Sequence, residues 1–204
     1  PWINYFFRRY PGVFDEVCYT GDGVASRLLS HNLAAQPELI MSKSRSAVTA
    51  WEVVKYAPGV TTTSGTNYWF NSLSTSSALY TGTIDGVWGP AAPAPTASTY
   101  AVAYVSGNAN GVNTSAATYV AYLFATLAGI SKVGSYTGNG SNQTINCGFA
   151  AGARFVLIKC TSAVGDWFVY DSVRGIVAAN DPHLSLNTTV AEVTTDDSID
   201  PDNS

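Results

Sequence analysis

Apolar and polar residues alternate along the chain in short runs, with the two-residue period of β-strands. Val133–Thr137 and Gln143–Phe149 flank a Gly-Asn-Gly turn, a pattern that predicts a tight hairpin. Arg154–Cys160 is a mostly apolar run, and a polar turn separates it from the shorter run Trp167–Tyr170. No window longer than a turn shows clear helical spacing, and Val24–Leu29 comes nearest. Short strands at roughly 8–12-residue spacing therefore predict an all-β fold of the β-sandwich or jelly-roll kind.

The sequence repeats itself at an offset of 116 to 117 residues. Tyr19–Gly23 recurs as Tyr136–Gly140 with one substitution, Asp to Asn. Leu33–Val54 matches Phe149–Tyr170 at eight of 22 positions. Self-similarity at a fixed offset is the mark of a duplicated structural unit. We therefore predict tandem β-sandwich repeats, in which one β-rich unit is copied along the chain.

Six residues at equivalent positions are the expected structural anchors of the two copies. A tryptophan that recurs at one place is expected in the core, on a central strand. Glycines that recur in a turn sequence are expected to serve the turn geometry. The anchors are Trp51 with Trp167, Gly21 with Gly138, and Gly23 with Gly140.

The offset also suggests how the chain is divided. Residues 1–12 are predicted to hold the closing strand of a preceding repeat, 13–129 a complete β-sandwich repeat, and 130–204 an incomplete second repeat that lacks a counterpart of Gly89–Gly129. The first of these assignments rests on aligned aromatic pairs, Tyr5 with Tyr122 and Phe7 with Phe124. We expect a head-to-tail array cut at both ends. The second unit is then expected either to miss strands or to receive them from another chain.

Composition and charge narrow the class of protein. The chain is 46% hydrophobic and only 12% charged, and about a fifth of it is Ser or Thr, which excludes intrinsic disorder. Its net charge is −4, and Arg8-Arg9 is the largest basic cluster, so nucleic acid is not an expected partner. The longest apolar stretch, Tyr119–Ile130, is too short to span a bilayer. Membrane insertion is therefore not expected.

The residues that usually carry catalysis form no known enzyme motif here. His31 and His183 do not align between the copies, and a catalytic triad needs a base oriented beside a nucleophile. Both histidines are predicted to be satisfied or exposed side chains. Cys18, Cys147 and Cys160 do not align with cysteines in the other copy either, and we expect reduced packing thiols. We predict no catalytic residues, no cofactor and no enzyme activity.

Four aspartates gather near residue 200 with the oxygen ligands that a calcium loop uses. They lack the spaced glycine and the final bidentate glutamate of the familiar calcium hand. A solvated acidic turn without a metal is therefore the prediction for Asp196, Asp197, Asp200 and Asp202.

Two tryptophans, Trp69 and Trp88, have no tryptophan partner in the other copy. An exposed aromatic that belongs to one copy can stack on a sugar ring or anchor a neighbouring subunit, which makes both candidate ligand-binding residues. The alternative is packing beneath a long loop, as a satellite of the core.

Several segments in a fixed order resemble a repeated module of virion structural and tail-fibre-like proteins of tailed bacteriophages. They are Tyr119–Ala125, Lys132–Gly140, Cys147–Phe149, Phe155–Lys159, and Asp166–Asp171 followed by Arg174-Gly175. The chain departs from that pattern at Cys160. It also has Lys55 and Pro58 opposite Asp171 and Arg174, so a polar site built on the Asp/Arg pair would exist in one copy only.

The resemblance implies a structural or adhesive role and a place in the virion, on the tail or the particle surface. Expected partners are other virion proteins, copies of the chain itself as a homo-oligomer, most often a trimer, and a host surface glycan or receptor. The leading hypothesis is a tail-fibre or surface-appendage segment that contributes to host attachment. A carbohydrate-binding module and a capsid decoration protein are the alternatives. A glycan depolymerase is a remote one, because it needs two carboxylates at catalytic separation.

Overall fold

The computed structural model describes residues 4–61, 68–74, 88, 93–107 and 111–200, without the side chains of 68–71. Every regular element in these ranges is a β-strand, which confirms the prediction of an all-β fold. None of the described segments forms a helix long and apolar enough to cross a membrane. The chain divides into two compact units. The first comprises Pro1–Ser72 and Tyr80–Leu127, and the second comprises Leu73–Leu79 and Ala128–Ser204.

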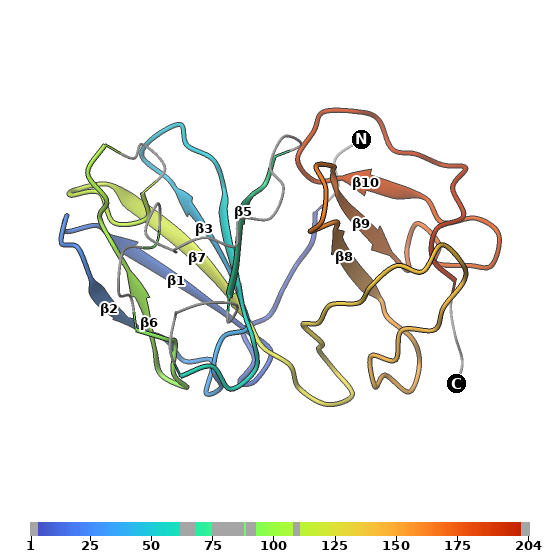
Figure 1. Ribbon diagram of the computed structural model, residues 1–204, viewed down its shortest axis with the longest axis horizontal. Helices are drawn as coiled ribbons and strands as arrows, with labels where there is room; N and C mark the ends of the chain where they lie inside the picture. Colours follow the sequence, from blue (N-terminus) through green and yellow to red (C-terminus); the bar gives the residue numbers. More distant parts are fainter. Residues whose placement is uncertain (1–3, 62–67, 75–87, 89–92, 108–110, 201–204) are drawn as a thin grey trace. The chain divides into compact units, whose positions relative to one another are not determined.

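The first unit contains two antiparallel sheets (Figure 1). The larger has the strand order β1-β7-β3-β4-β5, and the smaller consists of β2 and β6. The strands are β1 (Phe14–Thr20), β2 (Arg27–Ser30), β3 (Leu39–Ser44), β4 (Glu52–Tyr56), β5 (Tyr68–Ser72), β6 (Thr99–Val102) and β7 (Thr118–Phe124).

The core of the first unit lies between these two sheets. Alternate residues of β7, at positions 119, 121 and 123, belong to the same buried cluster as Leu29 of β2 and Tyr100 of β6. Because side chains alternate across a strand, one face of each sheet is turned toward the other. The Tyr19 ring stacks on Tyr119 with centroids 5.1 Å apart, and its hydroxyl donates to the Val112 carbonyl at 2.6 Å.

The second unit contains one three-stranded antiparallel sheet, in the order β10-β9-β8. Its strands are β8 (Phe155–Lys159), β9 (Trp167–Asp171) and β10 (His183–Ser185). Buried residues are few here: among the described residues from 128 onward they are Trp167, Val169, Tyr170, Asp171, Asp181 and His183. A second sandwich is therefore absent from the described part of the chain.

The hairpin expected at Val133–Thr137 and Gln143–Phe149 is wrong, because neither segment is a strand and neither contains a buried residue. The first unit supplies the reason. There the equivalent turn, Gly21–Gly23, leads from β1 in one sheet toward β2 in the other. The two strands pair with β7 and β6 respectively, and not with each other. In the first unit these turn residues thus mark a change of sheet.

The β3–β4 and β8–β9 hairpins have the same register. Leu39 lies opposite Lys55, and Phe155 lies opposite Asp171. Both members of the first pair are shifted by 116 residues to give the second. In each hairpin the next strand, β5 or β10, pairs on the outer side of the second strand. The same register and the same place of the third strand are what a duplicated three-strand unit predicts.

Candidate functional site

The ligand-binding candidates from the sequence do not form a site. Trp88 is 0% exposed and belongs to the core cluster of the first unit. A sugar ring stacks on an accessible aromatic face, so Trp88 is unsuited to that role, and the alternative of packing in the core is the correct one. The backbone of Trp69 lies in β5 opposite Lys55. Its side chain is outside the described part of the structure.

The two equivalent tryptophans differ in their degree of burial. Trp167 begins β9, at the centre of its sheet, and is 6% exposed, as expected of a core anchor. Trp51 precedes β4 and is half-buried, and its ring stacks on Tyr122 with centroids 5.7 Å apart. The expectation of a central-strand position is therefore right for Trp167 and wrong for Trp51.

The equivalent glycines also differ in their surroundings. A Cβ on Gly21 would lie 2.1 Å from the carbonyl oxygen of Thr114, whereas a Cβ on Gly138 would meet nothing within 4 Å. Gly23 and Gly140 share a left-handed backbone, with φ of 76° and 75°. A Cβ on Gly23 would lie 3.1 Å from Ser115, and one on Gly140 would meet nothing. Among the described residues, the loop that packs on the glycines of the first unit thus has no counterpart around those of the second.

The edge of β8 is the candidate interaction site. The strand order of the second unit ends at β8, so the side of Val156–Lys159 turned away from β9 carries no further strand among the described residues. We call this side the β8 edge. A sheet edge presents backbone N–H and C=O groups that can pair with an added strand. In the first unit the corresponding side of β3 is paired with β7 over six residues.

Exposed apolar side chains are common on the second unit. A folded domain that stands alone normally limits contiguous apolar surface, and larger exposed patches mark interaction surfaces. The exposed large apolar residues of this unit include Ile130, Tyr136, Ile145, Phe155, Val164, Val173, Val177, Leu186, Val190 and Val193.

A buried ion pair joins Asp171, at the end of β9, to Arg174. Both side chains are less than 10% exposed, and Arg174 also lies 2.9 Å from Glu192. Asp171 accepts the backbone N–H groups of Val173 and Arg174, each at 2.9 Å. Removing one partner of such a pair leaves a buried charge, which is strongly destabilising. The pair thus holds the turn after β9. It occurs in the second unit only, because the first unit has Lys55 and Pro58 at the aligned positions.

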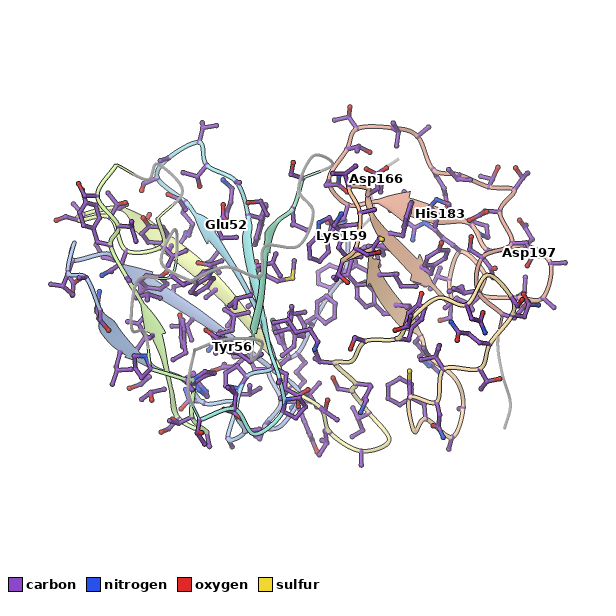
Figure 2. The ribbon with its side chains drawn as sticks, in the orientation of Figure 1. Glu52, Tyr56, Lys159, Asp166, His183 and Asp197 are labelled. Atoms are coloured by element: carbon purple, nitrogen blue, oxygen red, sulfur yellow. The ribbon has the colours of Figure 1, made fainter. Side chains whose placement is uncertain are left out.

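The acidic tract near residue 200 is tied to the sheet of the second unit. Asp181, 0% exposed, accepts the backbone N–H groups of Ser198 and Ile199 at 3.1 and 2.8 Å. Asp196 Oδ2 lies 3.1 Å from Nδ1 of His183, which is labelled on β10 in Figure 2. The prediction of a merely solvated turn is therefore wrong for Asp196, and Asp202 is outside the described residues. No group of three or more metal-ligating side chains occurs in the described ranges.

The remaining titratable candidates have structural surroundings. His31 is buried, its Nε2 lies 3.2 Å from the Thr96 carbonyl and its Nδ1 accepts the Leu33 N–H, so it is a satisfied histidine as expected. Burial lowers its pKa. The three cysteines are free thiols, but Cys18 and Cys160 are exposed, so packing is the wrong expectation for these two.

Sequence analysis missed Glu52 of β4, which is labelled in Figure 2 and only 2% exposed. Burial raises the pKa of its carboxyl to about 7. The hydroxyl of Ser72 on β5 donates to both carboxyl oxygens at 3.0 Å. Glu52 aligns with Phe168 in the other copy. An acidic residue at a position where the other copy has an apolar one could have identified Glu52 from the sequence as a buried carboxyl group.

The first unit also has a depression of about 300 Å³ at one end of its larger sheet. Ser44, Thr49, Tyr104 and Thr114 are among the residues that line it. Ser44 Oγ accepts the Ala47 N–H at 3.2 Å, and the Tyr119 hydroxyl accepts the Thr114 N–H at 3.0 Å. The lining thus includes residues that carry a hydroxyl group and the aromatic residues Tyr104 and Tyr119.

Comparison with known proteins gives one family. The chain matches no curated protein and no solved structure. The model of one family, described as Domain of unknown function (DUF7483), matches residues 11–201. That range contains every described strand of both units. The chain therefore belongs to the DUF7483 family.

Proposed function

We propose that the chain is a bacteriophage virion structural protein, a tail-fibre or surface-appendage segment that contributes to host attachment. Its units are tandem copies of one β-sandwich module, and the second presents the β8 edge to a partner. Its partners are other virion proteins and further copies of itself, in a trimer or another closed assembly. It acts by binding other surfaces and not by catalysis.

The observation that carries this proposal is the β8 edge together with the exposed apolar side chains of the second unit. A strand edge in a unit that also exposes apolar side chains is a favourable place for another chain to add a strand. Low charge and many Ser, Thr and Gly residues also suit extended packing between protein subunits. The resemblance of several of its segments to a module of phage virion proteins supports a place in a phage particle.

The experiment is to locate the protein on purified particles of the source phage. Antibodies raised against the chain, followed by electron microscopy with gold labelling, are expected to mark tail fibres or another appendage. Peptides of the chain should appear in the mass spectrum of the same particles. Label on the shell would replace the proposal by a capsid decoration protein. Particles without label and without such peptides would overturn it.

A carbohydrate-binding module is the second candidate, and the depression lined by Ser44, Thr49, Tyr104 and Thr114 favours it. Hydroxyl groups beside an aromatic ring suit the polar edges and apolar face of a sugar. A glycan array probed with the chain and with Tyr104→Ala tests this. Binding lost in Tyr104→Ala but kept in a control variant, Val48→Ala, supports the module. Equal binding by both variants, or none by the native chain, rejects it.

A further inference from the structure

Asn139 and Gly140 form an exposed turn in the second unit, and neither residue lies in a strand. The side-chain oxygen Oδ1 of Asn139 accepts the N–H of Ser141, two residues further on, at 2.9 Å. Asparagine commonly makes this bond in turns. The bond closes a ring of atoms that contains both the side-chain carbonyl carbon of Asn139 and the backbone nitrogen of Gly140. These two atoms are therefore held near each other.

The backbone nitrogen of Gly140 is open to approach. Glycine has no side chain that could shield it. Gly140 has a φ of 75°, in the left-handed region that favours glycine. A Cβ placed on Gly140, or on Gly138 just before the turn, would meet no atom within 4 Å. Water and the reacting groups therefore have free access to this turn.

The first unit contains the same turn with an acid in place of the amide. Asp22 Oδ1 accepts the N–H of Val24 at 3.1 Å, and Gly23 between them has a φ of 76°. Each of these three residues lies 117 positions before its counterpart in the second unit. The turn geometry therefore accepts aspartate as well as asparagine.

We propose that Asn139 is a modification site, where the folded chain loses ammonia and the asparagine becomes an aspartyl or isoaspartyl residue. The backbone nitrogen of Gly140 attacks the side-chain carbonyl carbon of Asn139 and gives up its proton. The new C–N bond closes a succinimide ring, and the side-chain amide group leaves as ammonia. Water then adds to either ring carbonyl, and the C–N bond that breaks decides between aspartate and isoaspartate. The inference does not depend on the proposed function.

Two other described asparagines each lack one of these conditions. Asn146 makes the same kind of bond, to the N–H of Gly148 at 2.8 Å, but the next residue is Cys147, whose side chain shields the backbone nitrogen. Asn113 is 0% exposed, and its amide nitrogen donates to Asp22 at 2.7 Å. Both should therefore react much more slowly than Asn139.

The aspartyl product would give the second unit the turn sequence of the first, Tyr-Thr-Gly-Asp-Gly. It also adds one negative charge to an exposed turn. In the first unit Arg27 Nε lies 3.4 Å from the Asp22 carboxylate. The residue aligned with Arg27 is Thr144, which carries no charge. The new carboxylate is therefore solvated by water, and we expect the fold to tolerate it.

Peptide mapping of the folded native chain tests the proposal. Samples kept at pH 6 and pH 8 are digested at intervals, and mass spectrometry follows the replacement of an amide by a carboxyl group. Conversion at Asn139 should be at least tenfold faster than at Asn146, the matched internal control. It should also be faster at pH 8, because the attacking nitrogen must lose its proton. Asn110, which also precedes a glycine, is outside the described residues, and its peptide is followed separately.

The products separate the succinimide route from direct hydrolysis of the amide. An isoaspartyl methyltransferase assay should label the peptide that contains Asn139, since only the ring intermediate gives isoaspartate. Aspartate alone at this position would overturn the route. Conversion at Asn139 no faster than at Asn146, or equal at the two pH values, would overturn the site itself.

Two variants complete the test. Gly140→Ala places a methyl group beside the attacking nitrogen and should slow conversion of Asn139 at least tenfold, with circular dichroism used to confirm that the variant is folded. Unchanged conversion would count against attack by this nitrogen. Asn139→Asp, the product of one branch, should have the same urea midpoint as the native chain. A lower midpoint would contradict the equivalence of the two turns.

Discussion

Single residues at aligned positions of the two units have different surroundings. Gly21 and Gly138 occupy equivalent places in the sequence, yet only Gly21 lies against the backbone at Thr114. Glu52 is buried in the first unit, where the second has Phe168. Because the cost of a substitution depends on what surrounds the side chain, equivalent positions are expected to respond differently.

The two glycines give a matched pair of substitutions. Gly21→Ala places a methyl group against the Thr114 carbonyl and should lower the free energy of unfolding by at least about 2 kcal/mol. Gly138→Ala meets no atom and should change it by less than about 0.5 kcal/mol. Urea denaturation of both variants measures the difference. Equal losses would show that the first-unit packing around Gly21 is not as described.

The buried Glu52 should make stability depend on pH. Its pKa is raised from 4.5 in the unfolded chain to about 7 in the folded chain. The folded state therefore holds the proton more tightly, and this contribution is fully present below pH 4.5 and is lost as the pH rises through 7. This contribution of Glu52 to the free energy of unfolding is at most about 3 kcal/mol.

Glu52→Gln removes this titration while keeping a group that can accept from Ser72. The variant should be more stable than the native chain at pH 8, by about 1–3 kcal/mol, and close to it at pH 4.5. His31 acts in the opposite direction because its pKa is lowered, so the comparison is made between variant and native chain at each pH. Parallel pH profiles from urea denaturation would contradict the assignment.

At the scale of elements, a strand forms only where a neighbour is present to pair with it. Phe14–Thr20 is a strand because β7 lies beside it over seven residues. The related segment at 131–137 has similar turn residues after it but is not a strand. A segment without a neighbouring strand forms no hydrogen bonds of a β-ladder, and its backbone N–H and C=O groups bind water instead. Pairing, and not local preference, decides the difference.

Hydrogen exchange tests this directly. Amides of peptides covering 14–20 should exchange at least tenfold more slowly than those covering 131–137, because ladder hydrogen bonds protect the first set only. The measurement is made on dilute protein, where strand addition between copies is negligible. Comparable protection of the two segments would show that the second unit already has a strand at 131–137.

At the scale of the whole molecule, the two units differ in their cores. The first unit contains a continuous buried cluster drawn from both of its sheets. The described second unit has only three buried apolar side chains, Trp167, Val169 and Tyr170. A small core offsets little of the conformational entropy lost on folding. Stability is therefore expected to be unequal between the units.

Denaturation in urea should proceed in two steps, with the second unit unfolding first. Trp167 is the tryptophan of that unit's core, so Trp167→Phe should abolish the low-urea change in fluorescence and leave the high-urea change intact. Circular dichroism on the same samples reports the loss of strands in each step. A single transition, seen alike by both methods, would mean that the units unfold as one.

The sequence by itself determined the strand-forming character of the chain, its internal similarity at an offset of about 116 residues, and the alignment of Trp51 with Trp167. These depend on side-chain period and on identity at a fixed offset, which are local properties. Only the tertiary structure decided that β1 and β2 lie in different sheets, that Trp88 is in the core and that β8 is the last strand of its sheet among the described residues. Each of these depends on which distant strand supplies the neighbour, and strand periodicity carries no information about that choice.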